Sequence, residues 1–267
     1  MSLITVNTLR CIRCGACVKV CPKGLLTLSE DTLCGEHPEN CIACGHCVAV
    51  CPTAALDNVY SPLKHQTEVP EALPLAKYTA EGFLRYRRST RAYKDIPVPR
   101  EKLLELVNIA RYAPTGHNSQ GISFVIVDNK AVIEQARVAV IKGMQNDADL
   151  RQQSENYSKM FSERGRDAIF RGAPCLILAT ADLDFVRARE NALFSLAYIE
   201  LYAPSLGLGT CWAGFAERFA LKEKSPFYDL FKIQPGKKIA GIVMVGYPQY
   251  RFQRFTERNQ PNICFYE

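Results

Sequence analysis

Three short apolar runs stand out in the last two thirds of the chain. They read ISFVIV at residues 122–127, CLILAT at 175–180 and KIAGIVMVG at 238–246. Runs of this length without alternating polar residues are typical of strands that are buried on both faces. We therefore predict a sheet with covered faces in this part of the protein. The pattern does not give the order of the strands.

Segments with helical patterns surround these runs. Residues 99–114 have a proline at each end and predict an amphipathic helix. Its apolar side would consist of Leu103, Leu106, Val107 and Ala110. Residues 79–88 predict a short helix, and residues 185–206 predict a long one. Residues 145–166 are polar, so they predict a helix or a mobile cover with little burial. The expected fold class is α+β.

The first 60 residues contain a duplicated motif between short apolar segments. Residues 3–6, 25–28 and 56–60 predict short strands. Residues 11–22 read CIRCGACVKVCP, and residues 41–52 read CIACGHCVAVCP. The four cysteines of the first copy recur 30 positions later in the second. The spacing therefore indicates an internal duplication.

These eight cysteines predict two [4Fe–4S] clusters. Thiolates are soft ligands that stabilise iron, and C-x2-C-x2-C-x3-C-P is the run in which the fourth cysteine binds the other cluster. One cluster is expected on Cys11, Cys14, Cys17 and Cys51, and the other on Cys41, Cys44, Cys47 and Cys21. Zinc sites or disulfides are the alternative. A zinc ion takes two C-x2-C pairs, however, and would leave surplus thiolates.

Composition agrees with ligand cysteines. The chain has 267 residues, of which 48% are hydrophobic, so it can form one or two domains. Residues 1–10 lack the features of a signal peptide, and we expect a cytoplasmic protein whose cysteines are ligands rather than a disulfide framework. The apolar run at 239–246 is far below the roughly 20 residues that span a bilayer, so no membrane partner is expected. The pattern assigns no role to Cys34, Cys175 or Cys264.

The positive charge belongs to the second part of the chain. The net charge is +6, residues 1–60 carry −1, and the remainder therefore carries +7. A modest basic excess can serve a phosphate-bearing ligand or solubility alone. No run of five or six like charges indicates nucleic acid, which is not expected as a partner.

A proline-containing connector separates two predicted domains. Residues 61–78 contain Pro62, Pro70 and Pro74 and no helical or alternating pattern, which is typical of a semi-rigid linker. We therefore predict a domain at 1–58, a linker at 59–78 and a second domain at 79–267.

Both domains resemble known families. Residues 1–58 resemble the bacterial two-[4Fe–4S] ferredoxin domain. Three segments of the second domain, in this order, resemble the FMN-dependent nitroreductase family: RRSTRAYKD at 87–95, APTGHNSQ at 113–120 and GLGTCWAGF at 207–215. The resemblance implies a ferredoxin-like domain followed by a nitroreductase-like α+β domain. It also implies FMN and an intertwined homodimer.

The resemblance assigns the residues that would bind FMN. Guanidinium groups bind phosphate through paired hydrogen bonds, which suits the four residues expected at the phosphate and ribityl end: Arg87, Arg88, Ser89 and Arg91. Taken alone, these residues could equally be a solvated basic helix end. Pro114, Thr115 and Asn118 would reach the FMN held mainly by the other subunit.

The third segment and the C-terminal region complete the implied site. Cys211, Ala213 and Gly214 would lay their backbone against the isoalloxazine and offer an amide near N5. The alternative for this segment is a glycine-rich helix end and turn. Arg254, rather than Arg251, would close on the phosphate.

Together the domains imply an oxidoreductase that passes electrons through two clusters and FMN to a small acceptor such as a nitroaromatic. No side chain is expected to act as a catalytic group. The donor would be a ferredoxin-like protein or NAD(P)H. The alternatives are reduction of an enone, a quinone or a halogenated ring, or a redox sensor or electron-transfer module without turnover.

Overall fold

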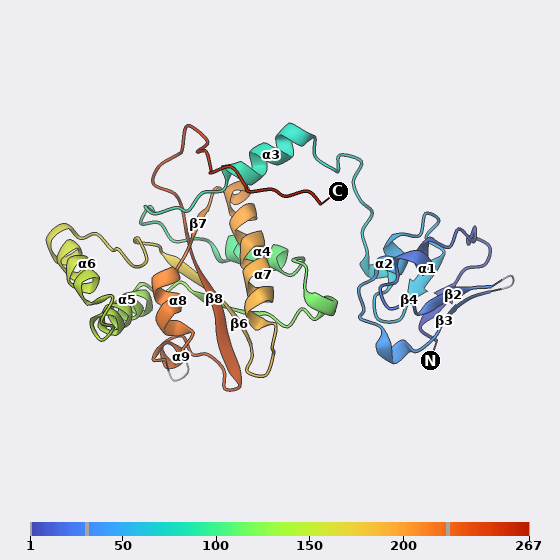
Figure 1. Cartoon of the computed structure of the whole chain (residues 1–267), viewed down its shortest axis with the longest axis horizontal. Coiled ribbons are helices and arrows are strands. Elements are labelled where there is room, and N and C mark those ends of the chain that lie inside the picture. Colours follow the sequence, from blue (N-terminus) through green and yellow to red (C-terminus); the bar gives the residue numbers. More distant parts are fainter. Residues whose placement is uncertain (1, 30–31, 223–224, 267) are drawn as a thin grey trace. The chain divides into compact units, whose positions relative to one another are not determined.

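The computed structural model describes residues 2–29, 32–222 and 225–266. The chain forms two compact units, each of which can be followed by its colours in Figure 1. The first unit extends to Leu75 and includes His117–Ser119, and the second takes Ala76–Gly116 and the chain from Gln120 onward. The domain boundaries at residues 58 and 79 stay predictions. Among the described residues, no helix has the length and apolar character that crossing a bilayer requires.

Two short antiparallel ladders frame the first unit. Strand β1 (Ile4–Val6) pairs with β4 (Leu56–Asn58), and β2 (Leu26–Leu28) pairs with β3 (Leu33–Gly35). Three of these strands confirm the predictions at 3–6, 25–28 and 56–60. Strand β3 was not predicted, because Leu-Cys-Gly has no strand pattern of its own. The remaining elements are α1 (Ala16–Val20), η1 (Pro38–Asn40), α2 (His46–Ala49) and η2 (Leu63–His65).

The apolar core of the first unit is small. It consists of Leu3, Ile4, Leu25, Leu26 and Leu56, all of which are at most 8% exposed. Five of the motif cysteines pack against it. A core of this size stabilises a domain only marginally, so small domains of this kind usually depend on metals or disulfides.

A four-stranded antiparallel sheet forms the centre of the second unit. Its order is β5 (Ser123–Val127), β6 (Cys175–Asp182), β8 (Lys237–Gly246) and β7 (Gly209–Trp212). Three strands confirm the predicted apolar runs. Strand β7, which pairs at the edge through Thr210 and Val245, was not predicted because four residues are too few for a strand pattern.

Helices cover both faces of this sheet. Helices α4 (Arg100–Ala110) and α7 (Ala188–Tyr202) pack on the face that carries Cys175 and Ile177. Helices α5 (Lys130–Gln145), α8 (Gly214–Ala220) and α9 (Phe227–Leu230) pack on the face that carries Leu176 and Leu178. Alternate residues of β6 therefore enter opposite cores, as the continuous apolar run predicts. Figure 1 shows α7 lying along the sheet.

Two further helices contribute little to these cores. Helix α6 (Arg151–Arg164) buries only Ser154, which agrees with the prediction of a polar helix at 145–166. Helix α3 (Lys77–Tyr86) lies at the predicted position 79–88 and buries no residue at all. Two 3-10 turns, η3 (Gly116–Asn118) and η4 (Ala203–Leu206), follow α4 and α7.

Candidate cluster and cofactor sites

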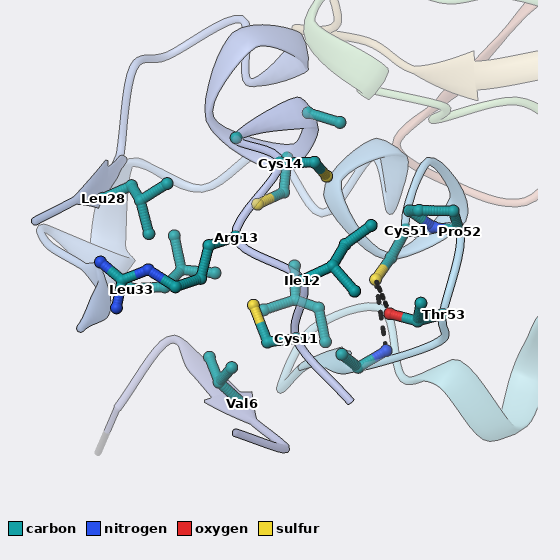
Figure 2. Close-up of a pocket in the computed structure, with 15 residues that line it drawn as sticks. Val6, Cys11, Ile12, Arg13, Cys14, Leu28, Leu33, Cys51, Pro52 and Thr53 are labelled. Atoms are coloured by element: carbon teal, nitrogen blue, oxygen red, sulfur yellow. Dashed lines mark hydrogen bonds between the residues drawn. The ribbon is translucent and has the colours of Figure 1, made fainter. Parts of the chain in front are cut away.

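The eight motif cysteines lie around two separate cavities of the first unit. One cavity is lined by Cys11, Cys14, Cys17 and Cys51, and the other by Cys21, Cys41, Cys44 and Cys47. Figure 2 shows the first cavity, in which Cys51 comes from the second copy of the motif. All eight are free thiols. The fourth cysteine of each copy thus stands with the first three cysteines of the other.

Local backbone geometry explains how each motif curls around its cavity. Gly15 and Gly45 adopt left-handed conformations, with φ of 71° and 72°, at the start of α1 and α2. This conformation reverses the chain between the second and third cysteines and is easily accessible only to glycine. The short helix that follows then carries the fourth cysteine away from its own loop.

Polar hydrogens point at several of the sulfur atoms. The backbone N–H of Ala55 donates to Cys51 Sγ at 3.2 Å, and that of Leu25 donates to Cys21 Sγ at 3.4 Å. Burial raises the pKa of Cys51, but donations from Ala55 and Thr53 outweigh it and hold that pKa below its usual value. Donors of this kind stabilise thiolate charge. The two sets of cysteines therefore fit anionic iron–sulfur cubes.

At two other cysteines, burial outweighs the hydrogen bonds that the sulfur accepts. It raises the pKa of Cys17 and of Cys47, although Asn58 donates from Nδ2 to Cys47 Sγ at 3.8 Å. Within the described residues, no three His, Cys, Asp or Glu side chains group as ligands of a single metal ion. The four cysteines of each set line a cavity instead of converging on one point.

In the second unit, the structure brings the first and third predicted segments side by side. Ser89 forms a parallel bridge with Thr210, and the N–H of Thr90 donates to the carbonyl oxygen of Thr210 at 2.8 Å. Residues 88–90 therefore extend along β7, on the edge that β8 leaves open. A side chain at Gly209 would collide with Thr90 Oγ1 and would lie 2.8 Å from Pro248 Cγ, so only glycine permits this approach.

A cavity of about 350 Å³ opens beside this junction. Its lining includes three cations, Arg88, Lys94 and Arg251, together with the side chains of Thr90 and Phe252. The Arg88 guanidinium lies 4.5 Å from the centre of the Phe252 ring. Ligand pockets are typically roughly 300–1,000 Å³, and clustered guanidiniums with a hydroxyl suit a phosphate group. The cavity thus fits a phosphorylated aromatic ligand.

Not every predicted cation lines this cavity. The Arg87 guanidinium lies 3.7 Å from the Glu200 carboxylate, which also accepts a hydrogen bond of 3.3 Å from Thr210 Oγ1. Burial raises the pKa of Glu200, and Arg87 opposes that rise. Arg91 is exposed and does not line the cavity. Arg254 lines a neighbouring hollow with Arg85, whereas Arg251 lines both spaces.

The third segment is hydrogen-bonded to strand β8 of the sheet. The N–H of Ala213 donates to the carbonyl oxygen of Ile242 at 3.0 Å, so this amide is already engaged with the sheet. Burial raises the pKa of Cys211, which favours a neutral packing thiol. Gly214 begins α8, and a Cβ there would meet no atom within 4 Å. Neither Ala213 nor Gly214 lines the cavity.

The second predicted segment forms a local loop. Thr115 follows Pro114 and accepts a hydrogen bond from the N–H of Gln120 through Oγ1 at 3.0 Å. Asn118 has a positive φ of 53° and belongs to the stretch that groups with the first unit. The three predicted residues of this segment do not line the basic cavity.

Sequence reasoning missed several lining residues. Thr90 and Lys94 lie inside the segment RRSTRAYKD, so that segment itself was a signal for them. Glu200 is in the middle of a long helix and had no such signal.

Comparison with known proteins identifies both parts of the chain. Residues 84–247 match the model described as the nitroreductase family. The chain belongs to the nitroreductase family. Residues 10–55 match the model of a 4Fe-4S dicluster domain. No curated protein matches the chain.

Solved nitroreductases share the fold of the second unit. A nitroreductase with bound FMN from Bacteroides fragilis is 20% identical, with a TM-score of 0.58 over 70% of this chain and 98% of that one. One from Desulfitobacterium hafniense, also with bound FMN, is 21% identical, with a TM-score of 0.57 over 72% and 100%. Iodotyrosine deiodinase bound to FMN and 3-iodo-L-tyrosine is 20% identical, with a TM-score of 0.52 over 70% and 98%.

These matches confirm the predicted families and fold class, a nitroreductase-like α+β domain that follows a dicluster ferredoxin domain. At the level of the family and the domain, they also confirm the prediction of an FMN-dependent oxidoreductase whose cofactors are FMN and two [4Fe–4S] clusters. The individual binding residues, the homodimer, the donor and the acceptor stay predictions.

Proposed function

We propose that this nitroreductase-family oxidoreductase accepts electrons at its dicluster domain and delivers them to a small acceptor at the basic cavity of the second unit. A [4Fe–4S] cluster carries one electron at a time, whereas FMN takes one or two, so bound clusters and flavin would supply the conversion between single electrons and electron pairs. The observation that carries the proposal is the separation of the eight motif cysteines into two sets of four.

The residues of the second unit would bind and orient the flavin. Arg88 and Arg251 would hold its phosphate, with Thr90 Oγ1 as a further donor. Arg251 is preferred to the predicted Arg254 because it lines the basic cavity with Arg88 and Thr90, whereas Arg254 meets Arg88 only in the neighbouring hollow. Arg87 would act indirectly, since its charge offsets the Glu200 carboxylate, which lines the cavity.

The predicted intertwined homodimer remains part of this proposal. Helix α3 buries none of its residues and leaves Tyr78 81% and Leu84 57% exposed. Apolar side chains in water favour association, and a second copy of the chain would cover them. A single chain has a mass of 29.9 kDa, so light scattering after gel filtration should give about twice that value.

The acceptor is proposed to be a small, flat, electron-poor molecule such as a nitroaromatic. Iodotyrosine deiodinase has the same fold and binds 3-iodo-L-tyrosine, so the fold admits a halogenated ring as the second candidate. Parallel turnover assays with a nitroarene and a halogenated phenol would separate the two. Binding of FMN without turnover of either acceptor class would favour an electron-transfer module.

Anaerobic purification followed by iron, sulfide and flavin analysis tests the proposal directly. We expect about eight irons per chain, from four per cube, and about one FMN. Cys14→Ser should remove iron, because Cys14 lines the first cavity. Cys34→Ser is the matched control, since Cys34 is exposed and lines neither cavity. Equal iron loss in both variants, or wild-type protein without flavin, would contradict the assignment.

A further inference from the structure

The two copies of the cysteine motif differ sharply in charge. Residues 9–23 carry four cations, Arg10, Arg13, Lys19 and Lys23, and no carboxylate. The equivalent residues 39–53 carry Glu39 and no lysine or arginine. Asn40, Ala43, Ala49 and Thr53 stand where the first copy has its cations. The two copies therefore share the same cysteine spacing but differ in the charge of the residues around it.

The loop before the first cluster set presents its side chains to water. Leu9 is 97% exposed and Arg10 is exposed as well, and neither lines the first cavity. Ile12, which is 64% exposed, and Cys14 line that cavity from its outer side. An apolar tip of this kind is unfavourable in water, so its position beside cluster ligands calls for an explanation.

Hydrogen bonds hold this loop in its projecting shape. Asn7 Oδ1 accepts from the N–H of Leu9 at 3.1 Å and from that of Arg10 at 3.2 Å. The carbonyl oxygen of Asn7 accepts from the N–H of Cys11 at 3.0 Å. Arg13 is tied by its guanidinium to the carbonyl oxygen of Ser29. The loop is therefore preorganised, and Arg10 is its projecting cation.

We propose that the exposed loop Leu9–Cys14 is the docking surface for an acidic protein that carries single electrons. This inference rests on the proposed function, because it names the partner from which the dicluster domain accepts electrons. In each encounter the partner's reduced centre would lose one electron, and a cluster held by Cys11, Cys14, Cys17 and Cys51 would gain it. No covalent bond forms or breaks, and no proton is transferred.

The chemistry of the clusters favours a protein over a nicotinamide at this loop. NAD(P)H delivers a hydride, which carries two electrons together, whereas a [4Fe–4S] cluster takes one electron at a time. Electron-transfer encounters bury little area and depend on complementary charge for their association rate. Leu9 and Ile12, with Arg10 and Arg13 in the same loop as the ligand Cys14, have the size and charge for such an encounter with an acidic partner.

The test measures how fast an acidic plant-type ferredoxin, reduced beforehand, reduces the anaerobic holoprotein at several salt concentrations. Electrostatic steering changes association rates by about 10- to 1,000-fold, so Arg10→Glu should slow the reaction at least about tenfold at low salt and flatten its salt dependence. Asn40→Glu introduces the same side chain at the matched position of the second copy and should leave the rate within about twofold. Leu9→Ser should slow the reaction at every salt concentration.

Three results would overturn the docking surface. Asn40→Glu could slow the reaction as much as Arg10→Glu, Arg10→Glu could leave the rate unchanged, or Arg10 could instead govern binding to anionic phosphatidylglycerol vesicles with no effect on the ferredoxin rate. Iron content and reduction by dithionite are recorded for each variant. Wild-type protein without iron, or without reduction by dithionite, would contradict the proposed function itself. Failure of the docking surface is thereby distinguished from failure of the proposed function.

Discussion

A buried carboxylate beside the third segment gives the sharpest prediction. Glu217 on α8 has a side chain that is 7% exposed, and its Oε1 accepts a hydrogen bond of 2.7 Å from the N–H of Ile242. Its Oε2 lies 3.0 Å from Arg189, which also donates at 2.7 Å to the carbonyl oxygen of Ala240. Strand β7 ends at Trp212, so these side chains satisfy the backbone of β8 where its partner strand stops.

Glu217→Ala should lower the free energy of unfolding of the second unit by about 1–4 kcal/mol. Ile242 is 0% exposed, and a buried N–H left without an acceptor costs about 1–3 kcal/mol. The ion pair adds less than about 1 kcal/mol, because Arg189 is 41% exposed and water screens its charge. Glu217→Gln keeps an acceptor oxygen for Ile242 and should cost only about 1 kcal/mol.

Urea unfolding followed by tryptophan fluorescence measures this difference. Trp212 is the only tryptophan of the chain, and its ring centre lies 5.4 Å from the Arg189 guanidinium carbon, so its emission reports on this site alone. With a urea slope of about 2 kcal/mol per molar, the expected loss corresponds to a midpoint shift of about 0.5–2 M. Equal shifts for the alanine and glutamine variants would refute the argument that the unpaired Ile242 N–H dominates.

Three further changes test other parts of the second unit. Arg88→Ala should weaken FMN binding about tenfold or more with iron content unchanged, since charge-assisted hydrogen bonds contribute about 1.5–3 kcal/mol, and full flavin retention would argue against the phosphate assignment. Gly209→Ala should destabilise the protein by about 1–3 kcal/mol through its collision with Thr90, whereas Gly214→Ala, which meets no atom within 4 Å, should not lower the urea midpoint. The Tyr93 hydroxyl is buried and has no hydrogen-bond partner among the described residues, so Tyr93→Phe should leave stability unchanged or raise it by up to about 1 kcal/mol. Burial raises the pKa of Tyr93 well above its usual value, so the folded state keeps a proton that the unfolded state loses above pH about 10; stability should fall with pH there, and less so in Tyr93→Phe.

Much of the fold could be predicted from sequence because its signals are local. The runs at 122–127, 175–180 and 238–246 became β5, β6 and β8, since a strand buried on both faces must be apolar throughout. Strand β7 could not be predicted because Gly-Thr-Cys-Trp is too short to show a pattern. Its pairing with β8 follows from the register that the rest of the sheet imposes.

The basic cavity shows where sequence reasoning stops. Four arginines were expected at the phosphate, and of these only Arg88 lines the cavity, which Arg251 also lines, while Arg87 lies beside Glu200. A basic segment shows that cations are available, but side chains on neighbouring residues point in different directions. Which of them share a cavity depends on elements from distant parts of the chain.

The cysteine spacing by itself determined the chemistry of this protein. Iron–sulfur cubes need thiolates at fixed intervals, and the chain carries that requirement twice within 41 residues, from Cys11 to Cys51. The spacing also predicted the two sets of four thiols, and each set lines one cavity of the structure. Only the tertiary structure showed the loop at Leu9 projecting into water and placed residues 88–90 along β7. Ligand identity is a property of side chains in order along the chain, whereas exposure and cavity lining arise only when segments remote in sequence pack together.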